Sequence, residues 1–243
     1  MKNKSKKLTT STLALTALAI GSTQASVINI TPIEENGGDR AVAWNPTTTV
    51  ASNTDLLQGL TATASSGNFA LEASGAVPIF NDGSVGTWGV YVDGATNHDN
   101  FATGGNTGGT SVTYNLAPST FGYDITDVIV LGGWQDGGRD QQAYTVAFAP
   151  IGDLANFITV GSVNFQPTIT GQNHRAITTG LTDDGGGFIG QGVGAVRFTF
   201  DSVENGYTGY AELDVIGSAA VPEPSSTALI GLGGLALLLR RKK

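Results

Sequence analysis

Short stretches in which apolar and polar residues alternate recur through the middle of the chain. The clearest are residues 111–116, 143–148, 193–200 and 211–216. A period of two places every second side chain on the same face, so these stretches predict β-strands with one buried face. Residues 125–131 form a more continuous apolar run, which suits a central strand buried on both faces.

Clusters of turn-forming residues separate these stretches. They are Asn81-Asp82-Gly83, Asp93-Gly94, Asp136-Gly137-Gly138 and residues 183–187. No segment before the C-terminal tail has a helical pattern. The chain is therefore predicted to be all-β, with an antiparallel β-sandwich of about eight to ten strands over residues 26–218.

The start of the chain has the pattern of a targeting segment. Lys2, Lys4, Lys6 and Lys7 precede a short apolar run at residues 13–20, and small residues follow before Ser26. This order of charge, apolar run and small residues is typical of a secretory signal peptide. We therefore expect residues 1–25 to direct export and the central domain to lie outside the cytoplasm.

The charge of the region between the two ends excludes one class of partner. Residues 26–220 contain four arginines and no lysine against 19 acidic residues, a net charge of −15. Such a domain repels phosphate backbones, so nucleic-acid binding is not expected. The acidity suits divalent cations or neutral sugars, and equally a role in solubility alone. The chain has no cysteine, which excludes disulfides and thiolate chemistry.

The last residues, 219–243, form a separate tail. Pro222 and Pro224 keep its first part extended, residues 227–239 carry no charge, and residues 240–243 are all basic. As a helix, the 13-residue apolar segment would reach only ~20 Å, less than the ~30 Å hydrocarbon core of a bilayer. Its basic end resists translocation, so the tail is predicted to hold the exported domain at a membrane.

The tail resembles a known sorting signal. Val221-Pro222-Glu223-Pro224, a short apolar helix and a basic end follow one another as in the PEP-CTERM signal of Gram-negative bacteria. That resemblance implies processing by a membrane protease of the exosortase type, and a place on the cell surface or in the extracellular polymeric substance. The alternative is an ordinary tail anchor.

The central domain resembles the discoidin (coagulation factor 5/8 type C) family. The resemblance covers residues 77–217 and is carried by Asp82-Gly83 with Trp88, by Tyr144-x-Val146, by Arg197-Phe198, and by Glu212 with Val215 and Gly217. It implies a galactose-binding-like jelly roll. One fold hosts many functions, so the ligand has to be argued from a site.

The same resemblance implies a calcium site. The positions that match the family's calcium ligands are Asp82, Ser84, Thr87 and Glu212. Calcium takes six to eight oxygen ligands, which carboxylates, hydroxyls and backbone carbonyls supply. The alternative is a plain β-turn that an aspartate caps.

A sugar site needs an aromatic ring for the C–H face and polar groups for the hydroxyls. Trp134, Asp136 and Arg139 are the most suggestive group, since they fall together in a loop-like segment. The alternative is that Trp134 and Trp88 are core aromatics and that Arg139 pairs locally with Asp136 or Asp140.

No catalytic motif is recognisable in the chain. We therefore expect a non-catalytic, exported protein whose sandwich binds extracellular polysaccharide. Two alternatives stay open at this stage: a purely structural matrix protein without a small ligand, and a secreted glycan-degrading enzyme that uses one of the many acid pairs.

Overall fold

The computed structural model describes residues 26–48, 55–90, 98, 100–106, 109–169 and 171–221. The predicted signal peptide at residues 1–25 lies outside these residues. So do Pro222, Glu223, Pro224 and the apolar segment with its basic end. Within the described part of the chain, no helix is long and apolar enough to cross a bilayer.

The described chain is built almost entirely from strands. They are β1 (Val27–Asn29), β2 (Ile33–Asp39), β3 (Ala64–Ser66), β4 (Ala102–Gly105), β5 (Thr110–Asn115), β6 (Tyr123–Trp134), β7 (Gln142–Pro150), β8 (Ile158–Phe165), β9 (Asn173–Asp183), β10 (Gly190–Phe200) and β11 (Tyr207–Ala219). Two short 3-10 helices, η1 (Leu71–Ala73) and η2 (Val77–Asn81), lie between β3 and β4.

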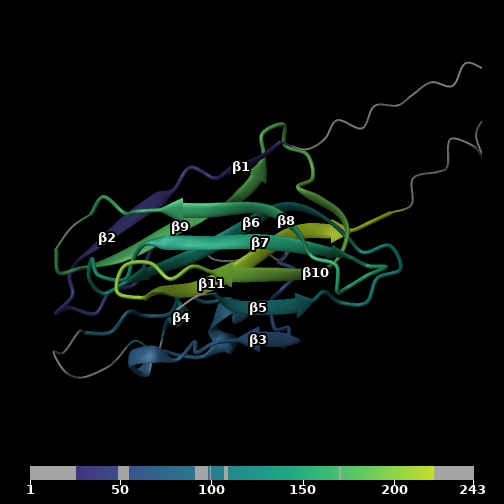
Figure 1. Ribbon diagram of the computed structural model, residues 1–243. Helices are drawn as coiled ribbons and strands as arrows, with labels where there is room; N and C mark the ends of the chain where they lie inside the picture. Colours follow the sequence, from purple (N-terminus) through teal and green to yellow (C-terminus); the bar gives the residue numbers. More distant parts are fainter. Residues whose placement is uncertain are drawn as a thin grey trace, which may run out of the picture.

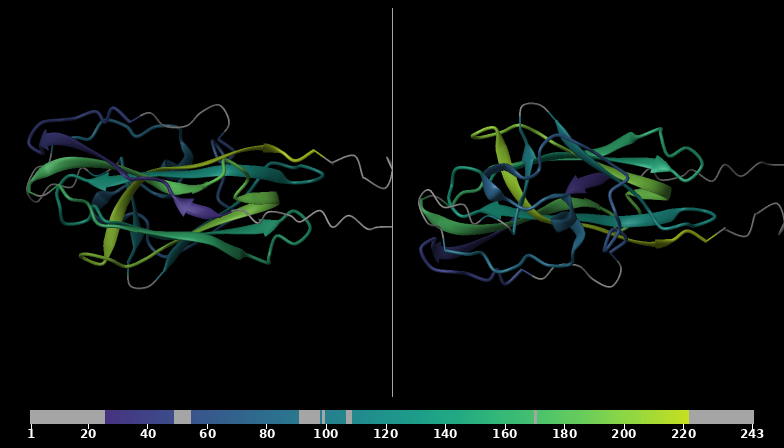
Figure 2. Two further views of the ribbon diagram at one scale, coloured as in Figure 1. Left: turned by 90° about the horizontal axis from the view of Figure 1, so that it is seen from above. Right: turned by 90° about the horizontal axis from the view of Figure 1, so that it is seen from below.

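The strands form two facing layers, and all pairings between named strands are antiparallel (Figure 1). One layer runs β3-β5-β10-β7-β8. The other runs β4-β11-β6-β9, with β1 and β2 both paired to β9. A bulged contact of β10 with the start of β6 joins the layers along one edge. Figure 2 shows the layers from above and below.

The predicted fold class is confirmed. The four alternating stretches lie in or overlap β5, β7, β10 and β11, and the continuous apolar run lies inside β6. Apolar side chains from both layers fill the space between them, among them Val112, Val146, Phe198 and Leu213. The strand number is eleven among the described residues, slightly above the expected range.

A second cluster of buried rings lies at one end of the sandwich. Trp88, Phe101, Trp134 and Tyr207 belong to it, with Trp44 packed against it. The rings of Trp88 and Phe101 are 4.6 Å apart, and those of Phe101 and Trp134 are 5.1 Å apart. This cluster supports the loops that follow β6 and precede β11.

The first and last described residues lie together at the opposite end (Figures 1 and 2). There the N–H of Asp184 donates to the carbonyl of Ser26 at 3.1 Å, and the N–H of Ala220 donates to the carbonyl of Gly122 at 2.9 Å. The loop face and the chain ends are therefore at opposite poles of the sandwich.

Gly133, near the end of β6, allows the close approach that brings Trp134 into the ring cluster. Its φ is +135°, and a Cβ there would lie 1.8 Å from the carbonyl oxygen of Arg175 on β9. A side chain therefore has no room at this position, and the backbone conformation itself favours glycine.

We predict that Gly133→Ala lowers the free energy of unfolding by more than about 3 kcal/mol, because β6 and β9 would have to separate. Gly152→Ala is the matched control. Gly152 lies in an exposed turn with no atom within 4 Å of a built Cβ, so a change within about 0.5 kcal/mol is expected. Urea unfolding of both variants checks this, and equal stabilities would contradict the close approach.

Candidate functional site

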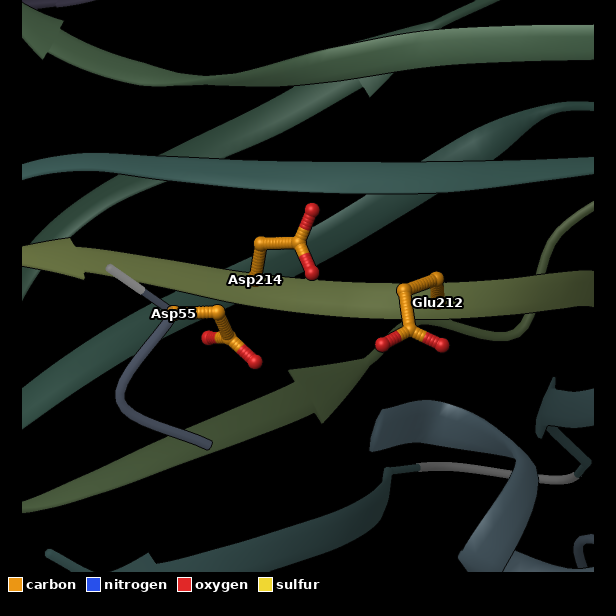
Figure 3. Close-up of side chains that lie close together, drawn as sticks. All are labelled: Asp55, Glu212 and Asp214. Atoms are coloured by element: carbon orange, nitrogen blue, oxygen red, sulfur yellow. The ribbon is translucent and has the colours of Figure 1, made fainter. Parts of the chain in front are cut away.

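Three carboxyl groups meet beside β11. The side chains of Glu212 and Asp214 come from the strand itself, and Asp55 comes from a separate segment that lies along it (Figure 3). One oxygen from each side chain lies within 4.8 Å of the other two. Glu212 and Asp214 are fully buried, and Asp55 is half-buried.

The strand pairing explains why these groups gather. Residues two apart on a strand point to the same side, which puts Glu212 and Asp214 together. β4 covers the edge of β11 only over Tyr207–Tyr210. Beyond that point the Asp55 segment takes its place: the N–H of Leu56 donates to the carbonyl of Val215 at 2.8 Å, and the N–H of Val215 donates to Asp55 Oδ1 at 2.9 Å.

The loop after η2 closes the other side of this acidic cluster. The N–H of Gly83 donates to Glu212 Oε1 at 3.1 Å, and the carboxyl of Asp82 lies close enough to that of Glu212 for the two to shift each other's pKa. Ser84 and Thr87 are exposed. The Ser84 hydroxyl accepts from the N–H of Gly86 at 3.0 Å. The structure thus brings Asp82 and Glu212, two of the four predicted calcium ligands, together. The Ser84 hydroxyl instead forms its hydrogen bond within its own loop.

Burial raises the pKa of carboxyl groups in this cluster. Burial first, and then the neighbouring carboxyls of Asp214, Asp82 and Asp55, raise the pKa of Glu212, while the Gly83 N–H lowers it. Together these effects raise the pKa of Glu212 to about 9. Burial likewise raises the pKa of Asp55 and of Asp82. At neutral pH the cluster must therefore hold either a proton or a cation.

The oxygens that remain suit a hard cation. Glu212 Oε2 and Asp55 Oδ2 are buried and accept no hydrogen bond in the described structure. A buried acceptor without a donor costs free energy, and a bound cation would remove that cost. Carboxylate oxygens are the ligands that calcium prefers, so the residues present fit such an ion. Asp82 also lines a hollow of about 460 Å³ beside the cluster.

The second group of predicted site residues lies at the loop end. Trp134 is the last residue of β6 and is buried, with its ring stacked 4.4 Å from that of His98. The guanidinium of Arg139 lies 4.4 Å above the ring of Tyr207 and 5.9 Å from that of Trp134. Trp134 therefore supports the loop from below, and Arg139 lies nearer the surface.

The arginines at this end pair over long distances in the sequence. Arg139 pairs with Glu72, Arg40 pairs with Asp136 at 2.6 Å, and Arg175 pairs with Asp140 at 2.9 Å. The local pairing of Arg139 with Asp136 or Asp140, which was part of the alternative to a sugar site, is wrong, because both aspartates are held by arginines from other elements. The buried position of Trp88 and Trp134 agrees with the core alternative.

Residues 220–242 match the family model of the PEP-CTERM protein-sorting motif. The chain carries a PEP-CTERM sorting motif. The predicted sorting signal is thereby confirmed, and Val221, Pro222, Glu223 and Pro224 fall within the matched segment. The PEP-CTERM motif indicates a secreted protein that is sorted to the cell surface. No curated protein matches the chain by sequence.

Solved structures similar to the domain that precedes the PEP-CTERM motif are carbohydrate-binding modules and discoidin-type domains. A family 32 module of Clostridium perfringens in complex with galactose is 14% identical, with a TM-score of 0.44 over 67% of this chain and 97% of that one. Another module from that organism, in complex with GalNAc-β-1,3-galactose, is 19% identical, with a TM-score of 0.42 over 67% and 99%. An F5/8 type C domain from Bacteroides fragilis is 13% identical, with a TM-score of 0.33 over 49% and 74%. Likenesses at this level carry no information about the ligand of this chain.

Sequence reasoning missed two members of the acidic cluster. Asp214 lies two residues after Glu212 in one of the alternating stretches, so the period of two was a usable signal. Asp55 lies 160 residues before Val215, whose N–H it accepts, and no local pattern marks it.

We predict that chelator-treated protein becomes less stable as the pH rises from about 5 to about 9. Glu212 has a pKa of 4.5 when unfolded and about 9 when folded. The proton therefore binds the folded state more tightly, and its stabilising contribution, complete below pH 4.5, is lost as the pH rises through 9. Added Ca²⁺ should restore the melting temperature at the alkaline end, because it replaces the proton.

Glu212→Gln tests the origin of this slope, with the exposed Asp184→Asn as the control. The first variant should flatten the dependence of melting temperature on pH, and the second should leave it unchanged. If neither Glu212→Gln nor Ca²⁺ alters the curve, the acidic cluster does not hold a shared charge.

Proposed function

We propose that this protein is exported from a Gram-negative bacterium and sorted by an exosortase-type protease to the cell surface or extracellular matrix. There its β-sandwich acts as a non-catalytic module that binds extracellular polysaccharide and is stabilised by calcium. In this proposal the chain consists of a signal peptide at residues 1–25, a β-sandwich at residues 26–218 and a sorting tail at residues 219–243. The observation that supports this localisation is the PEP-CTERM match at residues 220–242.

The loop end supplies the chemistry for a sugar. Arg139 and Glu72 form a half-exposed pair beside the ring of Tyr207, and Arg40 and Asp136 form a second pair nearby. Sugar hydroxyls both donate and accept, so a charged pair can offer an acceptor and a donor to neighbouring hydroxyls. In this arrangement Arg139 and Asp136 contact the sugar directly, whereas buried Trp134 positions the loop.

Calcium has a positioning role in this proposal. The ion would be held by Asp55, Glu212 and Asp214, with Asp82 beside them. It would fix the Asp55 segment and the Gly83 loop against β11, since both are attached there by hydrogen bonds to the same carboxyl groups. Ser84 and Thr87 would contribute only if the loop turned inward.

The ion pairs of the acidic residues at the loop end favour a binding role over hydrolysis. Glu72, Asp136 and Asp140 are each paired with an arginine. A glycoside hydrolase needs one carboxyl that gives up a proton and a second that attacks or activates water. Glu72 and Asp136 are fixed in ion pairs in which they accept hydrogen bonds. Burial raises the pKa of Asp140 to about 7, but this side chain is fully buried and does not reach a sugar on the surface.

We predict that the exported chain binds neutral glycans on an array saturably and that Arg139→Gln weakens this by about tenfold or more, because a charge-assisted hydrogen bond contributes ~1.5–3 kcal/mol. Arg197→Gln is the control. Arg197 lies on β10, where its guanidinium covers the ring of Phe157 at 3.7 Å. This variant should bind glycans like the unchanged chain.

Three outcomes would separate the candidate functions. Binding that depends on Arg139 supports the proposal. Silence on every glycan, with calcium present, would overturn it and leave a structural matrix protein. Release of reducing ends from the polysaccharide of the producing bacterium would identify an enzyme instead.

A further inference from the structure

The end of the sandwich where the described chain begins and finishes is unusually apolar. Nine large apolar side chains are exposed among the described residues, and six of them lie at this end. These six define the apolar end: Ile28, Phe121, Leu154, Ile158, Phe188 and Val221, which are 38–79% exposed. Scattered apolar residues on a surface need no explanation, but a gathering of this kind marks a contact surface.

A groove of about 510 Å³ runs into the same end. Its walls are largely aliphatic and aromatic, with Val27, Phe148, Pro150 and Ile158 among the lining residues. Ile158 both lines the groove and belongs to the six exposed residues of the apolar end, so the two features form one continuous surface.

The strand register places this surface beside the exit of the C-terminal tail. Val193, which lines the groove, pairs with Tyr123 on β6, and Tyr123 pairs with Ala219 at the end of β11. Two strand spacings, about 10 Å, therefore separate the groove from the tail. Phe121 is closer still, because the next residue, Gly122, accepts the hydrogen bond from Ala220.

We propose that the apolar end is a membrane-contacting surface, which rests on the lipid bilayer while the tail is still attached. This inference rests on the proposed function only in that the tail enters a bilayer. Phe121, Ile158 and Phe188 would enter the interfacial layer, and the groove would be covered by lipid.

The length of the tether selects the bilayer as the occupant. Only residues 222–226 separate Val221 from the apolar segment that begins at residue 227. Five residues span at most about 18 Å even when fully extended. A tail in the membrane therefore keeps Val221, where the apolar end meets the tail, within about 18 Å of the apolar segment of the tail.

The charge of this surface indicates the kind of lipid. Asp153 and Asp184 flank it in exposed turns, and residues 26–220 contain no lysine. Acidic side chains are repelled by anionic headgroups. The surface therefore suits a zwitterionic bilayer, where the apolar end can be buried without strong repulsion between its flanking aspartates and the headgroups.

The absence of cysteine makes a direct test available. Phe188→Cys in the full exported chain takes an environment-sensitive fluorophore at the apolar end, and Val42→Cys takes it at the loop end. Val42 is a matched control, since it is exposed and apolar but lies at the opposite pole, where its carbonyl contacts His174. Both chains are reconstituted through their tails into phosphatidylcholine vesicles, and flotation of the vesicles reports insertion of the tail.

We predict that the label at position 188 shifts to the blue and is quenched by lipids with spin labels near the headgroup, whereas the label at position 42 is unaffected. Phe121→Asp together with Ile158→Asp should abolish the shift at position 188 while the chain still floats. Both substituted side chains are exposed, so the fold should tolerate the change, and circular dichroism checks it.

Each other result overturns the proposal in a distinguishable way. A label at 188 that stays water-exposed on floating vesicles shows that the end stands clear of the membrane, and the sorting function is untouched. Shielding at 188 without vesicles shows that a second copy or the tail itself covers the surface. Failure to float removes the premise that the tail enters a bilayer, and with it the membrane step of the proposed function.

Discussion

The burial of several carboxyl groups beside β11 is the constraint on which the rest of the structure depends. Like charges this close, and out of water, cannot all ionise unless a proton or a cation compensates them. The Asp55 segment and the Gly83 loop are attached to β11 through these same groups. Closure of this side of the sandwich and neutralisation of the cluster are therefore one equilibrium, and any ion that binds the closed form stabilises the whole fold.

The strands could be predicted from the sequence because burial with a period of two is a local property. Their partners could not, and this is where the site was incomplete. Asp214 shares a strand with Glu212 and was missed although the period of two marks it, whereas Asp55 reaches the cluster only through the tertiary fold. In the same way, the turn residues after Trp134 suggested that this tryptophan lies in a loop. Instead, Gly133 allows β6 to extend as far as Trp134 and to place its ring in the second cluster of buried rings.

The two poles of the sandwich differ in chemistry. Arginine–carboxylate pairs occupy the loop end, and exposed apolar side chains occupy the end that leads into the tail. A sandwich with its chain ends at one pole is free to present the other pole to a large ligand. A protein that is sorted by its tail needs this arrangement if it is to bind polymer while it is still attached at the membrane.

The pairing of β11 with β6 has a mechanical consequence. β11 starts at the loop end with Tyr207 and pairs with β6 from Tyr210 to Ala219, where it passes directly into the tail. Tension between a polymer held at the loop end and an anchor at the tail would run along the length of β11. The hydrogen bonds of an antiparallel pair lie across that direction, so they are loaded together in shear and not opened one after another. The strand that carries the acidic cluster would thus also be the one that resists the pull of a moving matrix.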